Sequence, residues 1–586
     1  MSAPRPSLEA SFTTHDGVPL FYQHWPAERT PRRGAIVIFH RGHEHSGRMA
    51  HLASELDLPD FDFFAWDARG HGRSPGVRGF SPSLACSVRD VNTFVRHIES
   101  SHGVATDDMV ILGQSIGAVL VGVWAHDYAT PVRCLVLASP AFKVKLYVPF
   151  AVPGLSLAHR LLGNFFVSSY VKSKFLTRDV QRQESYDADP LISRSISVNM
   201  LLDLYRTAPR IIADAQAITA PTLLLISEKD WVVHHAPQHE FFSRLGSPIK
   251  EKHVLTGFLH DTFGEYDRRA AINTTREFVL RQFAAPLYRP DLRAADQHGA
   301  MHDEAVALSR PLSLLSPRGL YWSLSRLNIR FGSLWSAGLR LGRQTGFDSG
   351  SSLDYVYRNK PTGHGIVGRL IDKIYLNAIG WRGIRQRKQH IMELLCLAMD
   401  NLYRDRQAVR ILDIAAGHGR YIFDALQHYP RRPESIRLRD FDNMNVKDGT
   451  ALIRASGFED IAQFVAGDAF DAAELAATAP PASVGIVSGL YELFPENDAV
   501  RRSLFGLSKA IGAGGYLIYT GQPWHPQLEL IARSLTSHRG GKAWIMRRRT
   551  QAEMDQLVAE AGFEKLEQRI DEWGIFTVAL AQRRPA

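Results

Sequence analysis

Two segments of this chain each join an apolar stretch of strand length to a turn of small residues. The first stretch runs into Gly-Gln-Ser-Ile-Gly at residues 113–117, and the second runs into Asp-Ile-Ala-Ala-Gly-His-Gly at residues 413–419. A serine between two glycines after a strand is typical of a turn that exposes a nucleophile, whereas a glycine-rich turn before a helix is typical of nucleotide-like ligand sites. The 586 residues also exceed what one hydrophobic core usually serves. We therefore expect two catalytic domains in one chain.

The hydrophobic pattern predicts an α/β fold for both parts. Short apolar runs such as GAIVIFH, MVILGQS and PTLLLIS alternate with helical segments over residues 10–285, and a second alternation begins near residue 386. Apolar strands separated by helices predict a largely parallel sheet covered on both faces. The expected domains are residues 1–289 with a helical cap at about 143–210, a basic connecting segment at 290–385, and a Rossmann-like domain at 386–586.

The cysteines and the N-terminal sequence favour a cytoplasmic protein. Cys86, Cys134 and Cys396 are scattered, odd in number and without metal-ligand spacing, so neither a disulfide framework nor a metal site is predicted. The first residues lack the apolar run of a secretory signal.

The first signature predicts a serine nucleophile at Ser115. Such a nucleophile needs a histidine base and an orienting acid, and in this strand–turn–helix arrangement the chain order is nucleophile, acid, histidine. Asp230 follows the run PTLLLIS, and His260 follows the run KHVL. Both positions are loops at the carboxyl ends of predicted strands, so Ser115, Asp230 and His260 are the expected triad.

The segments HRGHEHSGR at residues 40–48, DARGHGRS at 67–74, GQSIGA and SEKDWVV resemble the monoglyceride lipase and lysophospholipase branch of the α/β-hydrolases. This resemblance covers roughly residues 10–285 and implies hydrolysis of a lipid-like carboxylic ester. It also implies oxyanion donors on the backbone of Gly42 and Ile116. The family usually has glycine where this chain has Arg41, which could alter the backbone of the loop, bring a positive charge toward the ester, or face solvent.

The second signature predicts a cofactor site. A glycine turn lets the backbone approach a ligand closely, and an acidic residue about 20 positions later is placed to accept ribose hydroxyls. Asp440 has this spacing, and Asp442 is the competing residue. The turn itself supplies four candidates, namely Asp413, Ala415, Gly417 and Gly419. By spacing alone, a nicotinamide dinucleotide would fit equally well.

The later segments VAGDAF, SGLYELFP and a final hairpin make residues 386–582 resemble class I methyltransferases that use S-adenosylmethionine (SAM), and more specifically a bacterial group of methyltransferases fused behind a hydrolase. The resemblance implies that Asp468 and Ala469 lie beside the adenine. Tyr491, Glu492 and His525 are placed by strand ends near the methyl acceptor. His525 is open to two readings, as a general base or as a structural residue.

The positive charge of the chain is local. Between Arg310 and Lys388 there are fourteen Lys or Arg residues and three Asp residues, interleaved with Trp322, Trp335 and Trp381. Such a segment can be a solvated linker, contact an anionic membrane, or bind nucleic acid. Because the neighbouring domain suggests lipid, we favour peripheral contact with the inner membrane face over nucleic acid.

The combined expectation is a bifunctional enzyme, a serine hydrolase of a lipid-like ester joined to a SAM-dependent methyltransferase of unidentified acceptor. An esterase that removed the methyl group installed by its partner would be futile, so consecutive steps on a related lipid are expected. The alternative is a nucleic-acid methyltransferase with a hydrolase-like targeting module.

Overall fold

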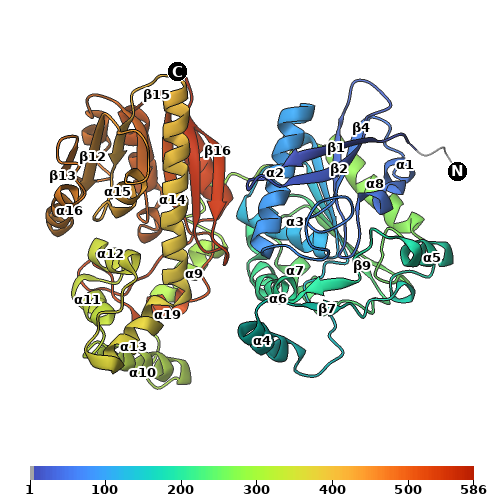
Figure 1. Cartoon of the computed structure of the whole chain (residues 1–586), viewed down its shortest axis with the longest axis horizontal. Helices are drawn as coiled ribbons and strands as arrows, with labels where there is room; N and C mark the ends of the chain where they lie inside the picture. The colour runs from blue at the N-terminus through green and yellow to red at the C-terminus, as the bar shows by residue number, and fades with distance from the viewer. Residues whose placement is uncertain (1–4, 586) are drawn as a thin grey trace. The chain divides into compact units, whose positions relative to one another are not determined.

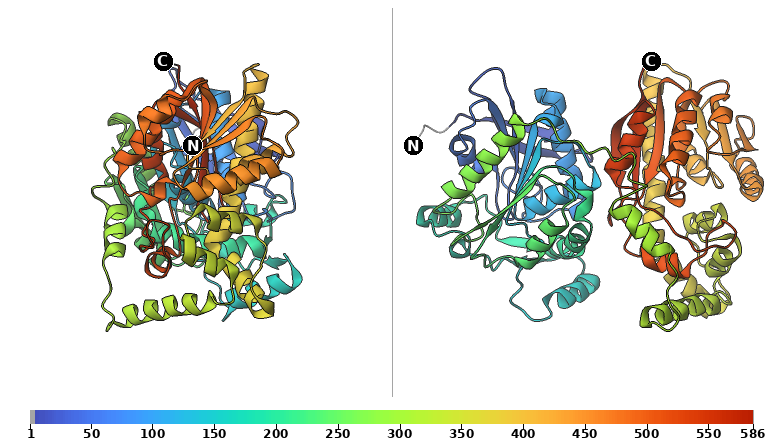
Figure 2. Two further views of the ribbon diagram at one scale, coloured as in Figure 1. Left: turned by 90° about the vertical axis from the view of Figure 1, so that its left-hand side faces the viewer. Right: turned by 180° about the vertical axis from the view of Figure 1, so that it is seen from behind.

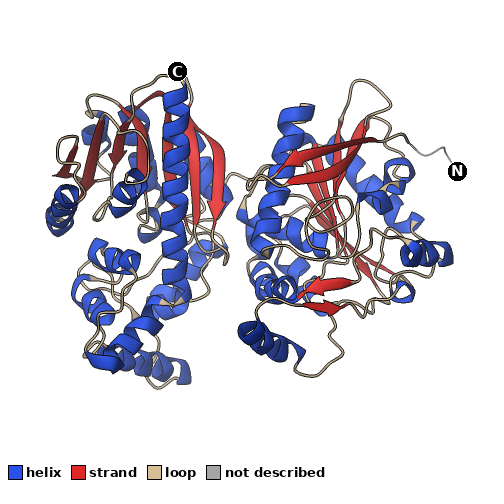
Figure 3. Ribbon diagram, in the orientation of Figure 1, coloured by secondary structure: helices blue, strands red, loops and turns tan. Residues whose placement is uncertain are grey.

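The chain forms two compact units, residues 1–290 and 291–586, in a computed structural model that describes residues 5–585 (Figure 1). The segment expected to connect two domains, residues 290–385, thus belongs to the second unit almost entirely. Both units are built around a mixed, mainly parallel sheet, as the alternating apolar runs predict. Helices and strands are distinguished by colour in Figure 3.

The first unit contains an eight-stranded sheet in the order β1-β2-β4-β3-β5-β6-β9-β10. The first two strands pair antiparallel, β2 pairs antiparallel with β4, and the other neighbours are parallel. The strands are β1 (Leu8–Thr13), β2 (Pro19–Trp25), β3 (Gly34–Phe39), β4 (Phe61–Trp66), β5 (Met109–Gln114), β6 (Cys134–Ala138), β9 (Thr222–Ser227) and β10 (Lys250–Leu255). Five of the central strands, β3, β4, β5, β6 and β9, are buried at every residue, which is why their sequences are mainly apolar without alternation.

Helices cover both faces of this sheet, and an insertion between β6 and β9 forms a cap (Figure 1). The covering helices are α1 (His51–Glu55), α2 (Leu84–His102), α3 (Ile116–Asp127), α7 (Ala236–Arg244) and α8 (Arg269–Ala284). The cap consists of α4 (Ala151–Leu162), β7 (Phe166–Ser168), α5 (Val180–Ala188), β8 (Ser195–Ser197) and α6 (Val198–Ala213). Helix α4 buries none of its residues.

The second unit contains a seven-stranded sheet in the order β13-β12-β11-β14-β15-β17-β16, in which only β17 runs antiparallel to its neighbours. The strands are β11 (Arg410–Asp413), β12 (Ser435–Asp440), β13 (Ala462–Ala466), β14 (Ala482–Val487), β15 (Ile511–Gly521), β16 (Phe563–Ile570) and β17 (Thr577–Arg583). The helices around it are α14 (Ile379–Arg404), α15 (Arg420–Leu426), α16 (Asn443–Ala455), α17 (Ala472–Ala476), α18 (Asn497–Ala510), α19 (Leu528–Ser534) and α20 (Gln551–Glu560).

Further helices gather at one end of this sheet, beside the first turns of α14 (Figures 1 and 2). We call four of them the helix layer: α10 (Pro317–Gly332), α11 (Ala337–Thr345), α12 (Gly350–Arg358) and α13 (Gly365–Leu376). Helix α9 (Ala300–Ser309) precedes them and contacts α19. The basic segment therefore folds into the methyltransferase-like unit.

A buried carboxylate ties the helix layer together. Asp372 of α13 accepts hydrogen bonds from the hydroxyl of Tyr355 on α12 at 2.6 Å and from backbone N–H groups of Gly338 and Gly363 at 3.1 and 2.7 Å. The hydroxyl of Ser336, which caps α11, donates to the same carboxylate. A hydrogen bond to a charged group contributes about 1.5–3 kcal/mol to stability. The Asp372 cluster therefore holds three helices of the layer firmly together.

Candidate active sites

Ser115, His260 and Asp230 form one continuous hydrogen-bonded chain in the first unit. His260 Nε2 lies 2.8 Å from Ser115 Oγ, and His260 Nδ1 lies 2.7 Å from Asp230 Oδ2. The other oxygen of Asp230 accepts the backbone N–H groups of Val232 and Val233 at 2.7 and 3.0 Å. Burial opposes ionisation of Asp230, but His260 and these donors lower the pKa of its carboxyl overall. The structure thus brings the three predicted residues together.

The turn that carries Ser115 is strained and leaves space only for glycine beside it. Ser115 has φ 56° and ψ −115°, a conformation that costs non-glycine residues about 1–3 kcal/mol. A Cβ atom on Gly117 would lie 2.3 Å from the carbonyl oxygen of Phe39, and one on Gly113 would lie 2.7 Å from Gly117 O. The two glycines therefore let the end of β5 and the start of α3 approach closely enough to project the serine.

A small cavity of about 90 Å³ lies at Ser115. Gly42 and Ile116 line it together with Ser115 and His260, as expected for residues whose backbone N–H groups would bind an oxyanion. The remaining wall comes mainly from cap side chains, among them Val167, Tyr170, Ile196, Leu201 and Leu204. The cap thus gives the serine an apolar approach.

Arg41 neither faces solvent nor carries an uncompensated charge. Its side chain is 2% exposed, and its guanidinium donates to Glu44 Oε1 at 3.0 Å and lies 5.1 Å from the ring centre of Tyr186. Asp261, next to His260, is 3.9 Å away. The solvent-facing reading of Arg41 is therefore wrong. Arg41 lines the cavity at Ser115, so a positive charge near the ester stays a prediction, although acidic side chains compensate that charge.

The second signature forms the expected glycine turn between β11 and α15. Gly417 and Gly419 have φ 56° and 71°, the left-handed region that favours glycine. The backbone N–H of Gly417 donates to Asp440 Oδ2 at 2.9 Å, which fixes the turn to the end of β12. Asp440 Oδ1 accepts from the N–H of Asp442 and from Asn445 Nδ2 at 2.9 and 3.0 Å.

A cavity of about 750 Å³ lies over this turn, and we call it the glycine-turn cavity. Six predicted cofactor residues line it: Ala415, Gly417, Gly419, Asp440, Asp468 and Ala469. Asp442 lines it too, but its carboxylate caps α16 by accepting the N–H of Met444. Asp413 differs from the expectation, because its side chain is fully buried beneath the turn and is bound by the Tyr421 hydroxyl.

The residues around the glycine-turn cavity fit a SAM-sized ligand. The volume lies in the 300–1,000 Å³ range of small-molecule sites, and the open backbone of the turn and the two carboxylates at strand ends are placed to meet polar ligand groups. The buried hydroxyl of Ser488 on the cavity wall has no hydrogen-bond partner within the described residues. Sequence reasoning missed the helix-layer contribution, namely Ser349 and Gly350 at the start of α12, because nothing in their spacing relates them to the turn.

A second large cavity, about 730 Å³, lies between the helix layer and the loops that follow the carboxyl ends of β14 and β15. We call it the helix-layer cavity. It adjoins the glycine-turn cavity, because five residues line both: Asp348, Leu353, Arg387, Gly489 and Leu493. Of the predicted acceptor residues, Glu492 and His525 line this cavity. Tyr491 does not, since its ring packs in the core and its hydroxyl donates to Ser503 at 3.0 Å.

His525 cannot serve as the general base of the helix-layer cavity. Its Nδ1 accepts the backbone N–H of Gln527 at 3.0 Å, and burial followed by the charge of Arg548 lowers its pKa to about 3. The ring is therefore neutral near pH 7 with its proton on Nε2. His525 can donate a hydrogen bond at this position but cannot accept a proton there.

The basic aromatic segment is only partly exposed. Trp381, expected at a membrane interface, is 6% exposed and lines the helix-layer cavity, because α14 places it inside rather than outside. Trp335 is 45% exposed, and Trp322 donates from its ring N–H to Glu529 at 3.0 Å. None of the helices within residues 5–585 combines the length and apolar character needed to cross a bilayer.

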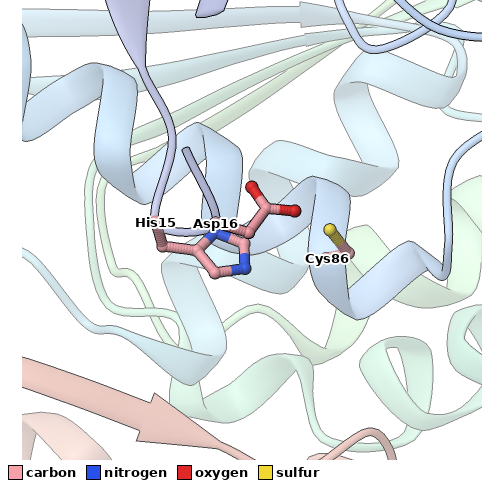
Figure 4. A group of neighbouring side chains, drawn as sticks. All are labelled: His15, Asp16 and Cys86. Carbon is pink, nitrogen blue, oxygen red and sulfur yellow. The ribbon is translucent and has the colours of Figure 1, made fainter. Parts of the chain in front are cut away.

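One group of potential metal ligands, His15, Asp16 and Cys86, lies in the first unit (Figure 4). Arg69 binds both oxygens of Asp16, at 2.9 and 2.5 Å, and this hydrogen bonding lowers the pKa of that carboxyl. Burial raises the pKa of the Cys86 thiol to about 12, so the thiolate that a metal requires is disfavoured. The chemistry of this group fits a structural ion pair rather than a metal site.

Comparison with known proteins identifies the family. The model of the family described as "Putative methyltransferase" matches residues 275–583, more than half of the chain. The chain belongs to this methyltransferase family. A second family model, described as "Serine aminopeptidase, S33", matches residues 30–267. An α/β-hydrolase domain therefore precedes a methyltransferase domain, as the two signatures predicted.

Individual relatives agree with this division. The protein YnbC of Escherichia coli is 56% identical over 576 residues, which cover 98% of each chain. Monoacylglycerol lipase of Mycolicibacterium smegmatis is 27% identical over 284 residues, 46% of this chain and 96% of the lipase. Mouse monoglyceride lipase is 29% identical over 221 residues, 37% of this chain and 71% of the lipase. The lipase-like relatives thus share the hydrolase domain only.

Proposed function

We propose that the first domain is a serine hydrolase of a lipid-like carboxylic ester. The hydrogen-bonded chain Ser115–His260–Asp230 carries this proposal. His260 takes the hydroxyl proton as Ser115 Oγ attacks the ester carbonyl, and it returns a proton to the leaving alcohol. Asp230 holds the imidazole in the required orientation, and the N–H groups of Gly42 and Ile116 stabilise the oxyanion.

A monoacylglycerol or lysophospholipid is the substrate class that the cap supports best. The cavity wall at Ser115 is apolar, and two relatives are named as monoacylglycerol or monoglyceride lipases. At about 90 Å³ the cavity is smaller than the 300–1,000 Å³ of ordinary ligand sites, so a long acyl chain requires the cap to move. The cap helix α4 buries no residue, which lowers the cost of such a movement.

Replacement of the nucleophile tests the hydrolase assignment. Ser115→Ala should abolish hydrolysis of a nitrophenyl butyrate and of monooleoylglycerol, whereas Ser101→Ala, on the surface of α2, should leave both rates unchanged. SAM binding to the Ser115→Ala protein should match the unmodified chain, because the proposed SAM site lies in the other unit. An unchanged unfolding temperature of the hydrolase domain would show that this domain is folded. Hydrolysis retained by Ser115→Ala would discard the serine assignment.

We further propose that the second domain transfers a methyl group from SAM, bound in the glycine-turn cavity. Asp440 accepts the ribose hydroxyls, Asp468 and Ala469 lie beside the adenine, and the turn of Gly417 and Gly419 leaves room for the backbone to approach the ligand. The cavity volume and the unpartnered Ser488 hydroxyl support this proposal. Bound SAM supplies an electrophilic methyl group.

Calorimetry with SAM separates Asp440 from its rival. Asp440→Ala removes a charged acceptor and the bond to the Gly417 N–H, so the Kd for SAM should rise about 10- to 100-fold. Asp442→Ala removes only a helix cap at the cavity edge and should change the Kd by less than about threefold. Equal effects would refute the assignment of Asp440, and no binding to the intact chain would refute SAM dependence.

We propose that the helix layer contacts an anionic membrane surface, which is the peripheral location expected for a cytoplasmic protein at the inner membrane face. Helix α10 exposes Leu320, Leu327 and Phe331 at 55%, 44% and 54%, and Arg326 and Arg330 are exposed between them. An apolar stripe flanked by cations is the pattern of an interfacial helix, and each cation near an anionic surface contributes about 1 kcal/mol.

Vesicle sedimentation tests this contact. The chain should bind anionic vesicles, and Leu327→Asp should release it, whereas Leu157→Asp on the cap helix α4 is the matched exposed control. Salt-sensitive binding to RNA or DNA with no binding to vesicles would instead favour a nucleic-acid methyltransferase.

A further inference from the structure

The helix-layer cavity is mainly apolar. Its walls include Ile329 of α10, Ile371 of α13, Ile384 of α14, and the aromatic side chains of Trp544 and Phe576. Its volume of about 730 Å³ lies in the upper half of the range for small-molecule sites. A cavity of this kind favours a ligand with a large apolar body, because every methylene removed from water contributes to binding.

Eight polar residues also line the cavity, namely Ser325, Asn328, Asp348, Arg387, Glu492, Gln522, His525 and Gln527. Three of them, Glu492, Gln522 and His525, offer groups that a ligand could bind. Glu492 is 8% exposed and Gln522 is 3% exposed, and both line the helix-layer cavity. Glu492 Oε2 and Gln522 Nε2 have no hydrogen-bond partner within residues 5–585. The third group is His525, whose Nε2–H is a hydrogen-bond donor because Nδ1 accepts the backbone N–H of Gln527. Buried polar atoms are rarely left unpaired, so these atoms indicate a ligand group that both donates and accepts hydrogen bonds.

Arg387 lies between Glu492 and the glycine-turn cavity. It lines both cavities, and its guanidinium lies 3.3 Å from Glu492 Oε1 and 5.0 Å from the ring centre of Phe576. The ion pair uses one oxygen of Glu492 and leaves the other one free. The free carboxylate oxygen therefore lies close to the wall that the two cavities share.

From these contacts we propose that the helix-layer cavity binds the methyl acceptor, and that this acceptor is a long apolar molecule ending in a hydroxyl group. This inference rests on the proposed methyl transfer from SAM. The hydroxyl donates to Glu492 Oε2 and accepts from His525 Nε2–H and Gln522 Nε2, which satisfies all three groups. A carboxylate would accept from the two donors but would meet the free oxygen of Glu492 with like charge.

Glu492 is the general base of this site. As the acceptor oxygen forms its bond to the methyl carbon, its O–H bond breaks and the proton passes to Glu492 Oε2. Bound SAM supplies the methyl group from a sulfonium, whose sulfur keeps the electron pair of the broken C–S bond. The product is a methyl ether, which a serine hydrolase does not cleave, so the first domain would not undo this reaction.

The mouth of the cavity matches such an acceptor. Tyr321 and Leu324 of α10 line the cavity and are also 63% and 52% exposed. These apolar side chains continue the exposed stripe of the same helix. An acceptor held in a lipid surface would thus meet apolar side chains along the whole path from the membrane surface to Glu492.

Binding of simple alcohols without SAM tests the acceptor class. Octanol, decanol and dodecanol should quench tryptophan fluorescence, since Trp381 and Trp544 line the cavity. The Kd should fall roughly tenfold for each two-carbon step. Ile371→Glu places a charge in the wall and should abolish this binding, whereas Val167→Glu, in the wall of the hydrolase cavity, should not. Unchanged SAM binding by Ile371→Glu shows that the variant is folded.

Methyl transfer from SAM to dodecanol then tests the base. Glu492→Gln should keep the Kd for dodecanol within about threefold and lower the transfer rate about 10²- to 10⁴-fold. Glu496→Gln, exposed on the same loop, is the matched control. SAM binding without any chain-length-dependent alcohol binding would overturn this inference and leave the proposed function intact. Transfer to lauric acid or dodecylamine in place of the alcohol would overturn the hydroxyl assignment, and absence of SAM binding would reject the proposed function itself.

Discussion

Asp413, buried beneath the glycine turn, makes the stability of the second unit depend on pH. Burial raises the pKa of its carboxyl to about 7, from an ordinary value of 3.8. Because the folded-state pKa is the higher one, the stabilisation is fully present below about pH 4 and is lost as the pH rises through 7. Between about pH 5 and pH 8 the loss amounts to about 2.5 kcal/mol, since one pKa unit corresponds to about 1.4 kcal/mol.

Asp413→Asn removes this titration while keeping the shape of the side chain. The free energy of unfolding of the variant minus that of the unmodified chain should be about 2.5 kcal/mol higher at pH 8 than at pH 5. Comparing the two proteins at each pH cancels the other titrating groups.

Native-state hydrogen exchange is the suitable assay, because it reports on β11 and α15 separately from the hydrolase domain. The opening free energies of amides in 410–413 and 420–426 should show the pH-dependent difference. Asp460→Asn, an exposed carboxylate of the same unit, should show none. An equal difference between variant and unmodified chain at both pH values would refute the reasoning.

Three further predictions concern the hydrolase domain. Asp230→Asn should lower kcat for ester hydrolysis about 10⁴-fold with little change in KM, because the histidine loses its orienting acceptor; a loss under tenfold in steady-state kinetics would contradict this. Gly117→Ala should destabilise the domain by roughly 1–3 kcal/mol in urea unfolding, since its Cβ would overlap a carbonyl of β3. His126 lies between Asp127 and Asp214 at 2.7 and 2.8 Å, and although burial opposes its charge, the two carboxylates raise its pKa. Its stabilisation is therefore present below about pH 6.5 and lost as pH rises above that value, so His126→Gln should destabilise the domain more at pH 6 than at pH 9 in thermal unfolding.

The sequence predicted the sheets and the two glycine-containing turns well, for a physical reason. Fully buried parallel strands are mainly apolar on both faces, so continuous apolar runs such as residues 109–114 and 222–227 identify the strands in the sequence. The triad was predictable because parallel strands deliver their carboxyl-end loops to one edge. Ser115, Asp230 and His260 each follow such a strand.

What the sequence could not predict are side-chain directions and walls made by distant segments. Tyr491 turns into the core and Glu492 into the cavity, although they are neighbours in one short turn. Arg41 contacts Tyr186, a cap residue far away in the sequence, as well as Glu44 of its own loop. The helix layer lines both cavities of the second unit because of how its helices pack in the folded chain. No local sequence pattern predicts that packing.

The proposed SAM site and the proposed acceptor site share five lining residues, so we expect binding at one site to affect binding at the other. Arg387 and Gly489 form part of the boundary for each compartment, so a molecule that reshapes this partition on one side alters the fit on the other. Thermodynamic reciprocity then requires that whatever factor the alcohol imposes on SAM affinity, SAM imposes on the alcohol.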